Sequence, residues 1–137
     1  GGMWQEGDDS LLETALREAE EEVGLLEGSL ELLATLPSAS PMQDHITVFP
    51  FVAHMAREQE LIAQPSEISK IFRVPIAYLM NNENYFYFKK SFDGELFCLP
   101  YIDYNGERIW GFTLKVMVDL LKTSLDAKVH LCFPFKP

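Results

Sequence analysis

Residues 17–25 read REAEEEVGL, and this segment decides how the rest of the chain is interpreted. Within it, Glu18, Glu21 and Glu22 are spaced i, i+3 and i+4, so on a helix their carboxylates share one face. Like charges at these spacings repel each other and destabilise a helix by roughly 0.2–0.5 kcal/mol per pair. We therefore expect these three carboxylates to bind a compensating cation. Their hard oxygen ligands suit Mg²⁺ or Mn²⁺. The spacing alone leaves a second interpretation open, a solvated acidic face.

The residues before this segment predict a helix from about Ser10 to Glu22. Ser10 and Glu13 have the spacing of a capping box. Gly24 stands where a left-handed residue ends a helix. Apolar residues at helical spacing form a stripe that would face a core: Leu12, Ala15, Leu16, Ala19 and Val23. The helix can therefore pack on a core while it presents the three carboxylates on another face.

Taken together, residues 1–25 closely resemble the Nudix box. That signature is Gly, five residues, Glu, seven residues, and then Arg-Glu-apolar-any-Glu-Glu-any-Gly-apolar. The first half departs from it, because Asp9 stands where the motif has Glu and six residues separate it from Gly2. Matching many fixed positions is a much stronger signal than a lone glycine motif. The second half matches at every fixed position, with two apolar residues where they are required: Arg17, Glu18, Glu21, Glu22 and Gly24, with Ala19 and Leu25.

The expanded glycine loop, with Asp8 in place, is similar to that of the coenzyme A diphosphatase branch of the family. Residues 71–79 (IFRVPIAYL) and 109–113 (IWGFT) resemble the same branch, whereas Gln5 stands where the branch usually has Asp. Nudix domains normally carry strands upstream of the paired glycines, on which this sequence begins. The resemblance therefore implies a single Nudix domain over residues 1–137, with upstream strands missing and the tail after about residue 126 unassigned.

The resemblance implies a metal-dependent hydrolase that cleaves the pyrophosphate bond of a nucleoside diphosphate linked to another moiety. In the coenzyme A branch the substrate would be coenzyme A or acyl-CoA, giving a 4′-phosphopantetheine product and adenosine 3′,5′-bisphosphate. ADP-ribose, NADH or another nucleotide derivative is an alternative substrate within the family. A non-catalytic binding module derived from the same fold is a second alternative.

The family pattern also assigns roles to residues. Glu18, Glu21 and Glu22 would bind Mg²⁺ or Mn²⁺, with a backbone carbonyl of Gly1 or Gly2 as an extra ligand. Glu18 is in addition a candidate general base.

Two further residues belong to the predicted catalytic set. Glu67 is a candidate for the loop carboxylate that serves as base in several family members, and its plain interpretation is a surface glutamate. Arg17 would tie the glycine loop to the helix through a salt bridge to Asp8 or Asp9. A helix-stabilising pair between Arg17 and Glu13 at i, i+4 is the alternative.

A few other residues are weaker candidates. Lys89, Lys90 and Arg108 could contact phosphates, but solvated positions are the more common explanation of such residues. Trp110 could stack on a base or simply be part of a core. His45, on a predicted apolar strand, has the same ambiguity.

Composition limits the choice of partners. The chain has 137 residues, with 11 basic against 21 acidic side chains, a net charge of −10 and a pI near 4.6. That charge argues against nucleic acid or an anionic membrane as a partner and leaves a nucleotide-type small molecule that a cation would bridge. Cys98 and Cys132 form no metal-binding pattern, and we expect reduced thiols and a cytoplasmic location. The resemblance is also compatible with a homodimer.

The rest of the chain predicts alternating short elements. Strands are expected at 30–36, 45–55, 71–74, 85–89, 95–99 and 101–104, with Pro50 at a bulge or edge. A short helix should run from Pro75 to Met80, and a longer one over residues 113–122. Asp93-Gly94 and Asn105-Gly106 predict tight turns. This pattern predicts an α/β (α+β) fold, and the resemblance implies a Nudix-type α/β/α sandwich with a mixed sheet.

Overall fold

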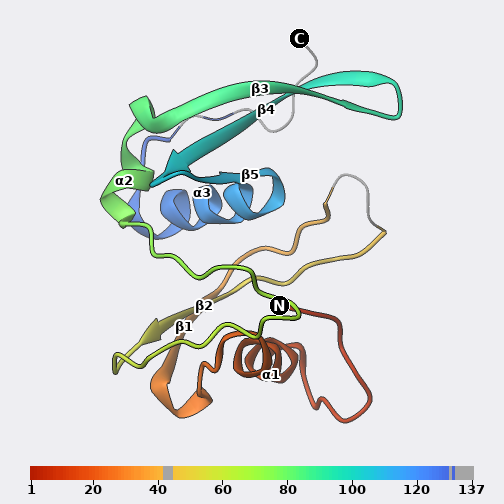
Figure 1. The fold of residues 1–137 in the computed structure, drawn as a ribbon, viewed down its shortest axis with the longest axis vertical. Helices are drawn as coiled ribbons and strands as arrows, with labels where there is room; N and C mark the ends of the chain where they lie inside the picture. Colours follow the sequence, from red (N-terminus) through yellow and green to blue (C-terminus); the bar gives the residue numbers. More distant parts are fainter. Residues whose placement is uncertain (42–44, 130, 132–137) are drawn as a thin grey trace. The chain divides into compact units, whose positions relative to one another are not determined.

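The computed structural model describes residues 1–41, 45–129 and 131. The chain forms two compact units, Gly1–Phe72 and Arg73–Pro137. In each unit a helix accompanies an antiparallel sheet (Figure 1), two-stranded in the first unit and three-stranded in the second. The predicted α+β class is confirmed. Both sheets among the described residues are antiparallel, so the mixed sheet is not found there.

The first unit begins with helix α1, Leu11–Val23. Ser10 is its N-cap, and the hydroxyl oxygen of Ser10 accepts a hydrogen bond from the Glu13 amide. Gly24 ends the helix with a left-handed φ of 69°, and the amides of Gly24 and Leu25 bond back to carbonyls in the last turn. Because both ends use the local signals expected of them, the predicted helix is confirmed to within one residue.

A 3₁₀ turn at Glu27–Ser29 leads from α1 into strand β1, Leu30–Thr35, which pairs with β2, Phe51–Met55. The register shifts between Leu32 and Ala34 on β1. The apolar stripe of α1 and residues of both strands line an open cavity of about 380 Å³.

The predicted strand over residues 45–55 is too long. Only Phe51–Met55 is a strand, preceded by an isolated bridge between Ala39 and Val48. Pro50 cannot donate a ladder hydrogen bond and lies just outside β2, where its carbonyl accepts from the Leu36 amide. The sequence predicted a bulge or an edge position at Pro50, whereas the register irregularity of this sheet lies on β1.

The strand predicted at residues 71–74, where the first unit ends and the second begins, is not formed, and these residues have irregular structure. Pro75 is the N-cap of the short helix α2, Ile76–Met80, and a 3₁₀ turn at Asn82–Asn84 follows. Strands β3 (Tyr85–Phe92), β4 (Glu95–Tyr104) and β5 (Glu107–Trp110) then form a meander, and α3 (Gly111–Leu125) completes the unit.

Both predicted tight turns of this meander are confirmed. Asp93 and Gly94 have φ of 50° and 80°, and Asn105 and Gly106 have φ of 52° and 84°. Two successive positive φ values are those of a type I′ hairpin turn, which Asp-Gly and Asn-Gly favour.

The strands predicted at 95–99 and 101–104 are one continuous strand, with Pro100 opposite Tyr87. Strand β5 pairs only with residues 101–104 of β4. Pro100 therefore lies where β4 has a neighbour on one side only, which is the setting in which a strand tolerates proline.

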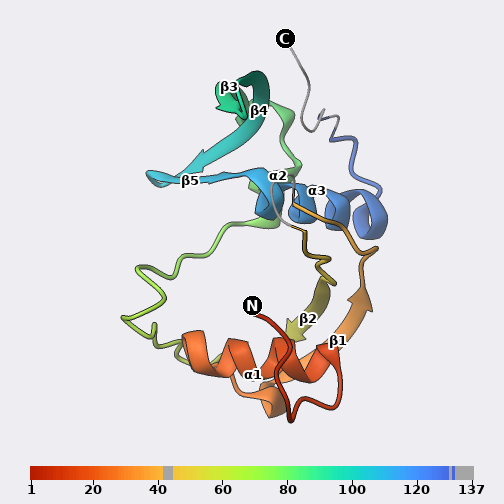
Figure 2. The same ribbon diagram turned by 90° about the vertical axis from the view of Figure 1, so that its right-hand side faces the viewer.

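The core of the second unit lies between α3 and one face of this sheet. Figures 1 and 2 show α3 running along β4 and β5. Ile102 and Ile109 of the sheet are buried against Leu114, Val118 and Leu121 of α3. The helix predicted at 113–122 is confirmed and extends further at both ends.

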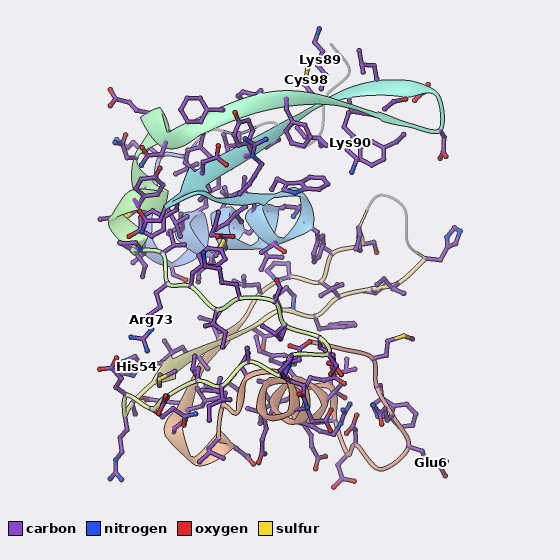
Figure 3. All side chains as sticks on the ribbon, in the orientation of Figure 1. Glu6, His54, Arg73, Lys89, Lys90 and Cys98 are labelled. Carbon is purple, nitrogen blue, oxygen red and sulfur yellow. The ribbon has the colours of Figure 1, made fainter. Side chains whose placement is uncertain are left out.

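The opposite face of this sheet is aromatic. Phe88 makes edge-to-face contacts with Tyr101 and Trp110, at centroid distances of 5.7 and 5.4 Å. Figure 3 shows Lys89 and Lys90 on opposite sides of the β3–β4 hairpin, as their alternation along the strand requires. Across residues 1–41, 45–129 and 131, no helix is long and apolar enough to cross a membrane.

Candidate functional site

The first three residues lie antiparallel to the middle of α1, and we call them the glycine strap. The Gly1 amine donates to Glu22 Oε2 at 2.7 Å. Gly2 lies directly against the carboxyl group of Glu18. The Met3 carbonyl accepts from Arg17 Nη2 at 3.3 Å. The strap therefore follows the acidic face of the helix, residue against residue.

Glycine at position 2 allows the backbone to approach the Glu18 carboxyl group this closely. A Cβ atom placed there would overlap the Glu18 carboxyl group, with Oε1 only 2.5 Å away and the other two carboxyl atoms closer still. At Gly1, by contrast, an added Cβ meets nothing within 4 Å. Close backbone approach, rather than an unusual φ, is what the second glycine provides.

Arg17 fastens the glycine loop to the helix through Asp8. Its Nε and Nη2 donate to the two oxygens of Asp8 at 3.0 and 3.2 Å, a two-pronged pair typical of guanidinium and carboxylate. The Asp8 side chain is only 5% exposed. Of the partners predicted for Arg17, the structure thus selects Asp8, while Glu13 binds the backbone amide of Asp9 instead.

These contacts change the acidity of Asp8. The hydrogen bonds from Arg17, aided by one from the Gln5 amide, lower the Asp8 pKa from 3.8 to about 2. The same pair raises the pKa of Arg17 above its usual value. Arg17 therefore acts as a permanent positive charge that holds the loop.

Sequence reasoning missed Thr14 as a member of this cluster. Thr14 is 3% exposed, and its hydroxyl donates to Asp8 Oδ2 at 2.8 Å. The sequence feature that could have identified Thr14 is its position beside the apolar stripe of α1, because a buried polar side chain needs a hydrogen-bond partner. Together Thr14 and Arg17 fix both oxygens of Asp8.

The three predicted metal-binding glutamates are brought together on one side of α1. Arg17 Nη1 donates to Glu18 Oε1 at 2.8 Å and to Glu21 Oε2 at 3.0 Å, so these two carboxylates converge on one nitrogen. Glu18 is largely covered, whereas the Glu21 side chain is 59% exposed. Glu22 is held by the Gly1 amine.

The chemical type of the donor groups fits a divalent metal ion, whereas their arrangement among the described residues does not form a metal-binding cluster. Carboxylate and carbonyl oxygens are the ligands that Mg²⁺ and Mn²⁺ prefer, and two of the carboxylates already share one cationic group. However, no cluster of three or more His, Cys, Asp or Glu side chains within the described part of the chain is arranged to hold a metal ion. The chemistry of the donors fits such an ion, and the metal site itself stays a prediction.

The C-terminal end of α1 is held by a distant segment. The amides of Ile62 and Gln64 donate to the carbonyls of Val23 and Glu22 at 3.0 and 2.9 Å. These bonds satisfy carbonyls that a helix end leaves free. Glu67 follows in an exposed turn, and its amide donates to the Gln64 carbonyl. The structure thus tethers the Glu67 turn to the helix end that carries Glu22.

The weaker candidates lie elsewhere. Arg108 pairs with Asp103 at 2.9 Å and lies over the Tyr101 ring, and Lys90 lies over Trp110. These contacts explain both cations as parts of the aromatic sheet face in the second unit.

His45 is exposed in a bend rather than on a strand. Figure 3 shows Glu6 pointing outward from the glycine loop. Cys98 is a buried free thiol, and Cys132 lies outside the described residues.

Comparison with known families agrees with this geometry. The model of the NUDIX domain family matches residues 1–93. This chain belongs to the Nudix family. The predicted resemblance is therefore confirmed, and the match includes the glycine strap, Arg17 and the glutamate trio.

Several curated Nudix proteins are similar to the chain. It is 31% identical over 120 residues to the uncharacterized Nudix hydrolase NudL of Photorhabdus laumondii, covering 88% of this chain and 64% of that protein. It is 27% identical over 146 residues to the mitochondrial Nudix hydrolase 15 of Arabidopsis thaliana, covering 99% and 50%. It is 30% identical over 117 residues to the mitochondrial coenzyme A diphosphatase NUDT8 of Homo sapiens, covering 82% and 49%. The chain thus spans about half to two thirds of the length of these Nudix relatives.

Proposed function

We propose that this chain carries the catalytic site of a metal-dependent pyrophosphohydrolase that cleaves coenzyme A or an acyl derivative of it. The contact between Gly2 and Glu18 carries the proposal, because it presses a backbone segment onto a carboxylate of the Nudix helix. Two findings support the choice of substrate. A relative 30% identical to the chain is named a coenzyme A diphosphatase, and the expanded glycine loop with Asp8 in place resembles that branch in sequence.

In this proposal Glu18, Glu21, Glu22 and the Gly2 carbonyl would hold Mg²⁺ or Mn²⁺. Such ions, when bound, neutralise charge on a pyrophosphate and make a water molecule more acidic. The polyanionic substrate and the carboxylates would otherwise repel each other.

The protein groups have separate tasks. Arg17 is a positioning residue, since it holds Asp8, Glu18 and Glu21 together rather than facing substrate. Glu18 is the proposed general base, and Glu67, in its turn near the helix end, is the alternative base. A base must come within hydrogen-bond reach of the attacking water, which Glu18 or the Glu67 turn could provide from opposite ends of the acidic face.

We further propose that residues 1–137 act as one Nudix domain, since the family match runs from the first compact unit into the second. The homodimer and the cytoplasmic location stay predictions. ADP-ribose or NADH is the alternative substrate class. A non-catalytic role is disfavoured by the retained trio, because a pure binder gains nothing from three neighbouring glutamates that repel one another.

The test compares conservative substitutions on one helix. Glu22→Gln should lower turnover of coenzyme A, with Mg²⁺ or Mn²⁺, by at least about 100-fold. Glu20→Gln is the matched control, because Glu20 is exposed on the same helix outside the trio, and it should retain full activity.

Parallel assays with ADP-ribose, NADH and dinucleoside polyphosphates decide the substrate class. Turnover of one of these at equal or higher kcat/KM than coenzyme A would replace the proposed substrate. Equal activity of both glutamine variants would show that the trio is not the metal site.

A further inference from the structure

Thr14 is a buried polar residue to which the proposed reaction assigns no task. It lies near the start of α1 and is 3% exposed. Its hydroxyl oxygen is 2.8 Å from Asp8 Oδ2 and 3.2 Å from the Ser10 carbonyl. A hydroxyl has a single hydrogen to donate. The shorter contact leads to an ionised oxygen and is the stronger one, so the hydrogen points to Asp8 rather than back into the helix.

Asp8 is the point at which the glycine loop is fastened to the helix. Its Oδ2 atom accepts hydrogen bonds from three donors: the Gln5 amide at 3.0 Å, Arg17 Nη2 at 3.2 Å and the Thr14 hydroxyl at 2.8 Å. The Gln5 bond lies within the loop, so Thr14 and Arg17 provide the link to α1. The Thr14 hydroxyl is placed by one side-chain torsion with few allowed values, whereas Arg17 is long and has many rotamers. Thr14 is therefore the stiffer of the two links.

Arg17 passes the position of Asp8 on to the glutamates. A guanidinium has five N–H donors in one rigid plane, and in Arg17 each of them has an acceptor. Three donate to Asp8 and to the Met3 carbonyl. The two on Nη1 donate to Glu18 and Glu21 at 2.8 and 3.0 Å. Because the group is planar and has no donor to spare, a shift of Asp8 also moves Nη1.

We propose that Thr14 is a positioning residue of this site, whose hydroxyl fixes Asp8 and, through Arg17, the carboxylates that Arg17 holds. The inference rests on the proposed function, in which Glu18 and Glu21 bind the metal ion, and adds to it a residue one hydrogen bond behind Arg17. A displacement of about 1 Å at a reacting group can cost about 100-fold in rate. Even a partial displacement of Glu18 is therefore measurable.

Two substitutions separate the hydroxyl from the rest of the side chain. Thr14→Val has nearly the same shape without the hydroxyl, and Thr14→Ser keeps the hydroxyl. Thr35→Val, at an exposed position at the end of β1, is the matched control. Thr14→Ala, which suits a helix interior, replaces Thr14→Val if that variant does not fold.

The kinetic test measures coenzyme A hydrolysis with Mg²⁺ or Mn²⁺, well below the melting temperature of each variant. Thr14→Val should lower kcat at least about tenfold, because it releases Asp8 and with it the group that holds Glu18. Thr14→Ser should stay within about threefold of the unmodified chain, since the hydroxyl is retained. Thr35→Val should have the kcat of the unmodified chain.

A double-mutant cycle tests whether Thr14 acts through Asp8. In an Asp8→Ala background the Thr14 hydroxyl has lost its charged acceptor. Thr14→Val should then lower kcat further by less than about twofold, because the effects of residues in one network do not add. Equal losses in both backgrounds would show that Thr14 acts by another route, and would overturn the inference.

A spectroscopic test needs no turnover. The chain has four arginines, so few Nε–H signals appear in a ¹⁵N-resolved NMR spectrum, and that of Arg17 is identified by its loss in Arg17→Lys. This hydrogen should exchange slowly with water in the unmodified chain and in Thr14→Ser. In Thr14→Val it should exchange at least about tenfold faster. The Arg108 signal, whose Nε donates to Asp103, should not change.

The outcomes separate the inference from the proposed function. Hydrolysis by the unmodified chain, with kcat and Arg17 exchange unchanged in Thr14→Val, overturns the inference and leaves the function intact. Faster Arg17 exchange in Thr14→Val without a loss of kcat assigns Thr14 to the stability of the loop alone and also overturns the inference. Faster exchange in Thr14→Val but not in Thr14→Ser, in a chain that hydrolyses none of the nucleotide substrates, supports the hydrogen-bonded link and overturns the proposed function.

Discussion

Replacing Gly2 by alanine should separate activity from stability. The added Cβ would overlap all three atoms of the Glu18 carboxyl group, the farthest of which, Oε1, is 2.5 Å away. Atoms of this kind need more than 3 Å, so the carboxylate must withdraw by about 1 Å. A displacement of this size at a reacting group can cost about 100-fold in rate. We therefore expect a loss of about two orders of magnitude in kcat/KM.

The thermal stability of the Gly2→Ala variant, unlike its activity, should stay unchanged or rise slightly. The clash involves the far end of a flexible side chain, which can move. Gly2 does not have a left-handed φ, so alanine fits its backbone and reduces the entropy of the unfolded chain. At compatible positions that effect stabilises a protein by about 0.4–1 kcal/mol. The melting temperature of Gly2→Ala should therefore equal or slightly exceed that of the unmodified chain.

The assay measures coenzyme A hydrolysis and thermal unfolding on the same samples, with Gly1→Ala as control. An added Cβ at Gly1 meets nothing within 4 Å, so that variant should keep its activity. In a Glu18→Asp background, where the side chain is shorter, Gly2→Ala should cost at least fivefold less than in the unmodified chain. Equal activities of Gly1→Ala and Gly2→Ala would refute the argument that the strap positions Glu18.

Three further predictions concern other parts of the chain. Because the Asp8 pKa is lowered from 3.8 to about 2, its charged form stabilises the fold above about pH 4, and this contribution is lost as the pH falls toward 2. Urea titrations should show that the difference in unfolding free energy between the unmodified chain and Asp8→Asn is constant near neutral pH and shrinks below pH 4. A difference that persists at pH 2 would contradict the pairing of Asp8 with Arg17. Leu114→Ala, at a fully buried position, should cost about 2–5 kcal/mol in the same measurement, and a cost below 1 kcal/mol would argue against the assigned core. Gly106→Val, at a φ of 84°, should lower the melting temperature while Gly28→Val, which has open space and no left-handed φ, changes it less.

Local signals explain what the sequence predicted well. Ser10 and Gly24 fix the ends of α1 through hydrogen bonds to their near neighbours, and Asp93-Gly94 fixes a hairpin through its own backbone angles. The side of α1 that carries the glutamates follows from helical periodicity alone. Each of these features depends on residues close together in the chain, so a single sequence is enough to find them.

What the sequence missed depends on distant partners. The segment at residues 71–74 has the composition of a strand but belongs to neither of the two sheets among the described residues, and β propensity depends on the pairing and packing that a sheet provides. Pro100 was predicted to separate two strands. Strand β4 continues through it because β5 pairs only with residues 101–104, so that β4 has a neighbour on one side only at Pro100. At the site, the resemblance predicted that Arg17 pairs with Asp8 or Asp9, and the structure shows the pair with Asp8; the choice between these two depends on the course of the loop, which no spacing rule supplies.

The charges around the glycine strap decide what can approach it. Three carboxylates contact the single guanidinium of Arg17, so the cluster keeps a net negative charge on a chain that is already strongly acidic. A diphosphate can lie there only with cations between it and the glutamates.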